Sequence, residues 1–137
     1  MSVFANDGEY SIDISFFVNV TPVNDPPQVL LNLNDITVNE DDSSEIIDLS
    51  VYFSDIDGDQ LIYSVEEDLD FLEGSISENL LELIFTENQN GSGDITVFAS
   101  DGFLSVQDTF TLTVLPINDA PIVDVIDDQS TDEDQSF

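Results

Sequence analysis

Aspartates are the side chains of this sequence best suited to chemistry, and the tightest group of them lies near the middle of the chain. Residues 54–60 read Ser-Asp-Ile-Asp-Gly-Asp-Gln, so that Asp55, Asp57 and Asp59 alternate. Gly58 permits a tight turn that would bring the three carboxylates together. Clustered carboxylate oxygens are typical ligands of hard divalent cations, so this turn is a candidate metal site.

Two alternatives to such a site arise from the surrounding residues. An EF-hand loop that starts at Asp55 would end at Glu66, but its sixth position is Gln60 where that loop needs Gly. The flanking residues also have the character of strands instead of helices, so we reject the EF-hand. A solvated acidic turn between two strands remains the alternative to a metal site.

Two Asn-Asp pairs bounded by prolines offer further oxygen ligands. Residues 22–27 read Pro-Val-Asn-Asp-Pro-Pro, and residues 116–121 read Pro-Ile-Asn-Asp-Ala-Pro. Proline stiffens such connections, although Asn-Asp beside proline is also common in ordinary capped turns. The return of the pair 94 residues later favours a device at a domain junction. The candidate ligands are Asn24, Asp25, Asn118 and Asp119.

Glu40 and Asp101 complete the set of candidate ligands. Glu40 belongs to the sequence Asn-Glu-Asp-Asp at residues 39–42, and Asp101 precedes Gly102. Taken individually, each resembles a residue of a surface loop.

No basic side chain can balance these acids. The chain has no Lys, Arg or His but 31 Asp and Glu in 137 residues, which gives a net charge of -31. Only water, hydroxyls, backbone N–H groups and metal ions can then stabilise the carboxylates. We therefore expect the folded chain to depend on divalent cations. Nothing here could neutralise a phosphate, which argues against nucleic acid and anionic membranes as partners.

The remaining composition argues for a folded, non-catalytic domain. A hydrophobic content of 41% with ten Phe is too high for a disordered chain. Without His, Cys, Lys or Arg, catalysis would need paired carboxylates or a metal, so we expect no enzyme. There are no disulfides, and no apolar run is long enough to span a membrane. A signal sequence would need Lys or Arg, so Met1 is expected to begin an excised fragment.

An internal repeat defines the organisation of the chain. Residues 3–27 recur at 97–121 with 12 of 25 positions identical, and the identities include the Asp-Gly pairs and the Asn-Asp pairs. We expect three segments: the C-terminal strands of one repeat in 1–24, a complete repeat in 25–118, and the N-terminal strand of another repeat in 119–137. The incomplete ends are expected to pair between molecules or to remain mobile.

Alternating apolar residues predict an all-β fold. In residues 108–115 Phe110, Leu112 and Val114 point to one face, and the segment from Ile12 to Val20 alternates in the same way. Further expected strands are 29–33, 46–53, 61–65, 80–85 and 94–100. About seven short strands with intervening turns predict an antiparallel immunoglobulin-like sandwich.

The order of these motifs resembles cadherin-like repeats of large bacterial surface adhesins, including repeats of RTX-type adhesins and dystroglycan-type cadherin modules. The resemblance covers essentially the whole chain. It implies extracellular calcium bound at junctions between consecutive repeats. One junction would use Asn24, Asp25, Asp55, Asp57 and Asp101, and the next would use Glu40, Asn118 and Asp119. Asp59 and Asp41 are additional candidates.

One departure from the family limits the expected number of ions. The Leu-Asp-Arg-Glu motif of cadherins is absent, and residues 75–82 read Ser-Ile-Ser-Glu-Asn-Leu-Leu-Glu instead. One or two ions at each junction are therefore expected.

Two functions follow as alternatives. The first is a repeat of an adhesin that calcium stiffens for cell adhesion or biofilm attachment, with neighbouring repeats as its partners. The second is a calcium-dependent carbohydrate-binding module of a polysaccharide-degrading system, for which Phe17, Phe98 and Phe103 are candidate sugar platforms. Packing against a neighbour is the other explanation for these rings. A halophile's acidic coat would explain the charge but not the repeated linker.

Overall fold

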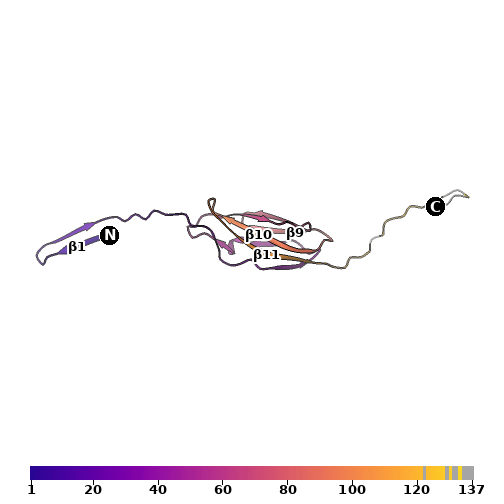
Figure 1. Cartoon of the computed structure of the whole chain (residues 1–137), viewed down its shortest axis with the longest axis horizontal. Coiled ribbons are helices and arrows are strands. Elements are labelled where there is room, and N and C mark those ends of the chain that lie inside the picture. The colour runs from indigo at the N-terminus through magenta and orange to yellow at the C-terminus, as the bar shows by residue number, and fades with distance from the viewer. Residues whose placement is uncertain (122, 129, 131–132, 134–137) are drawn as a thin grey trace.

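Two β-sheets packed face to face form the centre of the molecule (Figure 1). This computed structural model describes residues 1–121, 123–128, 130 and 133. The described strands are β1 Ser2–Asn6, β2 Ser11–Ser15, β3 Gln28–Val29, β4 Ile36–Asn39, β5 Glu45–Asp48, β6 Phe53–Ser54, β7 Ile62–Glu66, β8 Leu72–Ser77, β9 Leu80–Phe85, β10 Gly91–Ser100 and β11 Ser105–Leu115. A 3-10 helix, η1 Leu49–Val51, lies between β5 and β6. No helix in these residues is long and apolar enough to cross a membrane.

The larger sheet has the strand order β4-β11-β10-β7, and the facing sheet has the order β5-β9-β8. Neighbouring strands are antiparallel except β4, which pairs parallel with β11. Strands β3 and β6 form a short antiparallel pair of their own. The fold is the all-β immunoglobulin-like sandwich that the sequence predicts.

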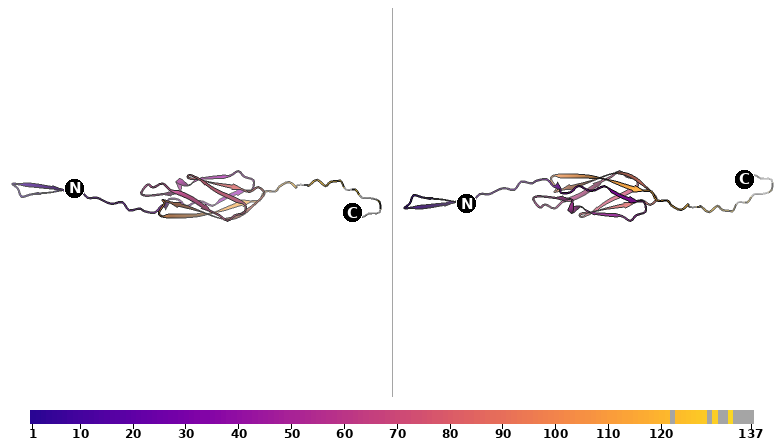
Figure 2. Two further views of the ribbon diagram at one scale, coloured as in Figure 1. Left: turned by 90° about the horizontal axis from the view of Figure 1, so that it is seen from above. Right: turned by 90° about the horizontal axis from the view of Figure 1, so that it is seen from below.

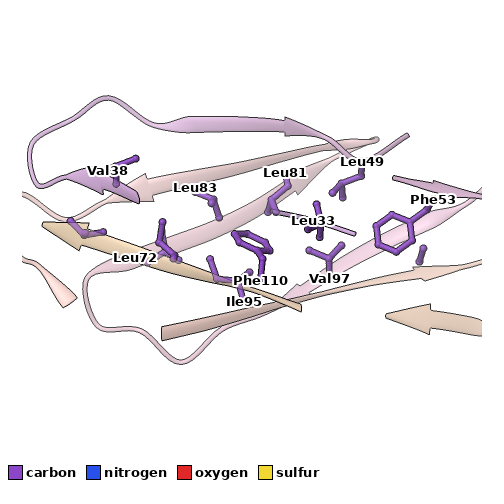
Figure 3. Packing of buried hydrophobic residues seen from close by; sticks show 13 residues of the cluster. Leu33, Val38, Leu49, Phe53, Leu72, Leu81, Leu83, Ile95, Val97 and Phe110 are labelled. Atoms are coloured by element: carbon purple, nitrogen blue, oxygen red, sulfur yellow. The ribbon is translucent and has the colours of Figure 1, made fainter. Parts of the chain in front are cut away.

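Alternating apolar side chains fill the space between the sheets (Figure 3). Phe110, Leu112 and Val114 of β11 are buried, as their period of two predicts. The neighbouring strand β10 supplies Ile95 and Val97, and the facing sheet supplies Leu72, Leu81 and Leu83. Leu49 of η1 and Phe53 of β6 are buried as well. This core fixes the positions of the loops at both ends of the sandwich.

The expected strand at 46–53 is wrong as a single element, because the chain breaks there into β5, η1 and β6. The Asp48 side chain accepts a hydrogen bond from the backbone N–H of Ser50 at 3.0 Å and caps the short helix. The expected strand at 29–33 is reduced to β3. Strands β4 and β8 were not expected.

Residues 1–24 lie outside the sandwich, and all of them are exposed. Strands β1 and β2 form a hairpin beyond one end of the sandwich, while residues after Leu115 leave from the opposite end (Figure 2). The alternating segment expected to reach Val20 is strand only as far as Ser15. The strand expected within 119–137 lies partly outside the described residues, and the described ones there contain none.

Candidate functional site

Residues 22–27, which form the entry linker, reach the sandwich through two hydrogen bonds. The Asn24 side chain donates to Asp101 Oδ2 at 3.0 Å. The backbone N–H of Asp25 donates to Asp57 Oδ2 at 2.7 Å. The structure thus brings four of the predicted ligand residues into direct contact, although the Asp25 bond comes from its backbone. The linker and two separate turns meet at this end of the sandwich.

The turn after β6 holds Asp55 in an unusual environment. Asp55 Oδ1 accepts hydrogen bonds from the N–H groups of Asp57 at 2.8 Å and Asp59 at 3.4 Å. Gly58 has a φ of 81°, which allows the chain to reverse there. Asp55 Oδ2 is buried, and nothing in the described part of the chain hydrogen-bonds to it. An unpartnered carboxylate oxygen inside a protein is costly unless a cation or water reaches it.

Asp101 caps the turn between β10 and β11. Its Oδ1 accepts hydrogen bonds at 2.7 Å from the N–H groups of Phe103 and Leu104. The Leu104 N–H, the Asn24 amide and the Phe103 N–H together hold the pKa of the Asp101 carboxyl below its usual value. This carboxylate therefore joins the linker to the turn in its ionised form.

Acid should weaken the contact between Asp101 and the linker. Because the folded pKa is lowered, the stabilisation is present above the unfolded pKa of about 3.9 and is lost as the pH falls through the folded pKa. We expect the melting temperature to fall as the pH drops below about 4, and Asp101→Asn to reduce this dependence. Thermal melting by circular dichroism between pH 2.5 and 7 measures it.

Asp7→Asn is the matched control, since Asp7 caps the β1–β2 turn and also has a lowered pKa, caused by the N–H groups of Tyr10 and Glu9. Its hairpin is separate from the sandwich, so the melting temperature of the sandwich should not change. An identical effect of both variants would contradict a specific role for Asp101.

A hollow of about 310 Å³ lies beside these contacts, lined by Pro22, Val23, Asn24, Asp57 and Asp59. Within the described residues, no group of three or more Asp or Glu side chains is arranged so that it could hold a metal ion by itself. Backbone N–H groups and the Asn24 amide occupy one oxygen of Asp55, one oxygen of Asp57 and both oxygens of Asp101. Any cation would have to compete with those donors or use the remaining oxygens.

The exit end of the sandwich is where residues 116–121, the exit linker, leave it. The arrangement there is different and centres on Glu40, which is only 3% exposed. Its Oε1 accepts a hydrogen bond from the N–H of Ile117 at 2.7 Å, and its Oε2 accepts one from the Asn90 side chain at 3.0 Å. The Glu40 N–H donates to the Leu115 carbonyl at 2.8 Å. The expectation of a surface loop is wrong for Glu40, which the fold buries against the exit linker.

The exit linker repeats the local geometry of the entry linker. The Asn118 amide donates to the Asp119 carbonyl at 3.2 Å, and the Asn24 amide donates to the Asp25 carbonyl at 3.3 Å. The structure brings Glu40 to the linker at Ile117, the residue before Asn118. Asp41 accepts a hydrogen bond from the N–H of Asn88 at 3.2 Å.

Asn90 was not among the residues expected at a site. It lies 50 positions from Glu40 in the sequence, and nothing in its local context indicates that it donates to a buried carboxylate. Glu40 follows β4 and Asn90 precedes β10. Only the pairing of both strands with β11 places the two residues at the same end. In a chain without basic residues, side-chain amides thus take a place that Lys or Arg often has.

Comparisons with known proteins identify the fold but no family. No family model and no curated protein matches the sequence. An endo-fucoidan hydrolase from glycoside hydrolase family 107 matches at 23% identity with a TM-score of 0.51, over 85% of this chain and 19% of that chain. Human protocadherin-24 EC1-2 matches at 21% identity with a TM-score of 0.51, over 67% of this chain and 44% of that chain.

This chain therefore spans less than half the length of either structure. At such identities the likeness concerns the fold alone. The protein is an immunoglobulin-like β-sandwich of the kind found in cadherin repeats, with carboxylates and amides gathered at the two ends where its linkers enter and leave.

Proposed function

We propose that this chain is a calcium-binding repeat of a bacterial extracellular adhesin, in which calcium stiffens the connections between consecutive sandwiches. The observation that carries the proposal is the meeting of the entry linker with two acidic turns in a chain without any basic side chain. Asp55 Oδ2, in the turn after β6, supports it because this oxygen is buried and has no hydrogen-bond partner among the described residues. Oxygen donors alone, with no nitrogen or sulfur ligand at hand, suit a hard cation such as calcium.

The residues that would hold the ion are those that join the linker to the sandwich, namely Asn24, Asp25, Asp55, Asp57 and Asp101, with Asp59 beside them. A bound cation would supply positive charge among carboxylates that otherwise repel one another. The chain's own part is to hold the linker against both turns by the bonds from Asn24 and Asp25. The linker then has one orientation relative to the sandwich.

The proposed location follows from the affinity that such sites have. Extracellular calcium modules bind with a Kd of about 10⁻⁴ to 10⁻³ M, so they fill outside the cell and stay empty in a calcium-poor cytoplasm. A repeat of this kind would be flexible before export and stiff afterwards. We therefore place the protein at the bacterial cell surface or in the medium.

Calcium should raise the melting temperature of the sandwich. With a Kd of about 10⁻³ M, 10 mM calcium would contribute about 1.4 kcal/mol, or roughly 6 to 11 °C for a domain of this size. Calorimetry with calcium, with sodium chloride at equal ionic strength and with a chelator measures the effect. Asp57→Asn should remove most of the shift.

Asp70→Asn serves as the matched control because it removes the same charge from an exposed turn. A shift that sodium reproduces, or that Asp57→Asn and Asp70→Asn reduce equally, would mean general screening of charge. The proposed site would then be absent.

A calcium-dependent carbohydrate-binding module is the second candidate. Its support is the exposed ring of Phe103, which lies two residues after Asp101 and whose N–H donates to that carboxylate. Phe17 is exposed as well, whereas Phe98 is half-buried. Retention on insoluble polysaccharides that requires both calcium and Phe103 would favour this function over a spacer.

A further inference from the structure

The β1–β2 hairpin reproduces the β10–β11 hairpin in register. Ser2 pairs with Ser15 as Thr96 pairs with Thr109, and Asn6 pairs with Ser11 as Ser100 pairs with Ser105. Every pairing in the first hairpin thus has a counterpart 94 positions later.

The turns of the two hairpins are also the same. Asp7 Oδ1 accepts hydrogen bonds from the N–H groups of Glu9 at 3.0 Å and Tyr10 at 2.7 Å, as Asp101 does two and three residues further along its own chain. Gly8 has a φ of 98° and Gly102 a φ of 97°. Local sequence is sufficient to form this turn, since one copy forms it outside the sandwich.

The two hairpins differ in what covers their apolar faces. Phe110 is 2% exposed, while its counterpart Phe16 is 43% exposed. Val114 is 2% exposed, while its counterpart Val20 is 82% exposed. The other exposed members of this face are Val3, Ile12, Ile14 and Val18. Water therefore contacts a face whose counterpart includes the buried core residues Val97, Phe110, Leu112 and Val114.

We propose that the face formed by Val3, Ile12, Ile14, Phe16, Val18 and Val20 binds a sheet-forming polypeptide segment with the chemistry of residues 25–96, and so completes a second sandwich. In the sandwich, the facing sheet covers the counterpart of this face. Leucines of β8 and β9, namely Leu72, Leu81 and Leu83, pack against the inner face of β10 and β11.

The edges of the hairpin indicate the same partner. Strand β7 pairs with Thr96–Ser100, and strand β4 pairs with Leu112–Leu115. In the part of the chain that the structure describes, the corresponding outer edges at 2–6 and 18–21 have no neighbouring strand. Strand β2 ends at Ser15, whereas β11 continues beyond the corresponding Thr109 to Leu115. A two-stranded hairpin is marginally stable alone, so it gains from a third strand on either side.

A second copy of this chain does not offer the required surface. In each copy the β5-β9-β8 sheet is already covered by that copy's own β10 and β11. Charge opposes the proposed contact only weakly, because residues 1–24 contain only three of the 31 acidic side chains, Asp7, Glu9 and Asp13. The segment that fits best is one joined directly to the N-terminal side of Val3.

The test is a chain extended by a copy of its own residues 25–96, joined to Val3 so that the spacing of 94 residues is kept. We expect amide hydrogen exchange at Val3, Ile12 and Phe16 to slow at least about 100-fold relative to the unextended chain. In the extended chain Phe16→Ala should restore fast exchange at these positions. Phe17→Ala, on the opposite side of the segment, should leave the protection unchanged.

Three outcomes would overturn the proposal. Exchange at Val3, Ile12 and Phe16 could stay fast while the added residues gain protection. The added segment could fail to fold, which would count against the hairpin because that segment folds when β10 and β11 complete it. Sedimentation could show that the unextended chain is already a dimer with these amides protected, in which case a second copy is the occupant.

Discussion

Phe110→Ala should lower the free energy of unfolding by about 3–5 kcal/mol, whereas Phe16→Ala should change it by no more than about 0.5 kcal/mol. The two residues are counterparts in the internal repeat and stand in the same sequence pattern. Phe110 is 2% exposed and belongs to the core cluster, so its removal leaves a cavity that the surrounding side chains fill only in part. Phe16 lies in the exposed connection to the hairpin.

Urea unfolding followed by circular dichroism measures both variants, with the transition slope as a check that unfolding remains two-state. Equal losses would show that Phe16 is packed against something in solution, which the arrangement of residues 1–24 outside the sandwich does not provide. A loss below about 1 kcal/mol for Phe110→Ala would contradict the packing of the core.

Asn90→Asp should destabilise the sandwich by about 1–3 kcal/mol at pH 7, an effect second only to that of Phe110→Ala. The change removes the amide that donates to Glu40 Oε2 and places a second carboxylate beside a side chain that is almost fully buried. No basic residue exists that could move in to compensate. Unfolding in urea at constant ionic strength measures the loss.

Asn32→Asp is the control, because it adds the same charge at an exposed position. Combining Asn90→Asp with Glu40→Gln should recover much of the stability, since the new amide can donate to the new carboxylate. If Asn90→Asp and Asn32→Asp were equally stable, Glu40 would not need its amide partner. Failure of the double variant to recover would show that Glu40 must be charged for another reason.

The two ends of the sandwich illustrate how a chain without cationic side chains accommodates carboxylates. At the exit end, both oxygens of Glu40 accept hydrogen bonds from protein N–H groups, and its charge is satisfied without an ion. At the entry end, Asp55 keeps one buried oxygen that has no partner in the part of the chain that the structure describes. The entry end is therefore where an added cation would change the protein most.

Strand alternation in the sequence was enough to predict the sandwich and much of its larger sheet. The alternation of apolar and polar residues predicted the buried face of β11, and the short apolar run at 80–85 predicted β9. Strand β4 was missed because it has only four residues, and β8 because its Gly and polar residues weaken the pattern. The segment at 46–53 was misjudged because the Asp48 cap competes locally with the strand.

By itself, the sequence determined what depends on neighbours along the chain: the turns at Gly8 and Gly102, the matching Asn-Asp linkers and the faces of the long strands. It also determined that no basic side chain balances the acids. Tertiary structure alone decided that Phe110 is buried and Phe16 exposed, because burial depends on which sheet faces a strand. It also decided that Asn90 meets Glu40 and that Asn24 meets Asp101, since these pairs lie 50 and 77 residues apart. Strand β11 pairs with both β4 and β10 and so brings Asn90 to Glu40, and the approach of the entry linker to the end of the sandwich brings Asn24 to Asp101.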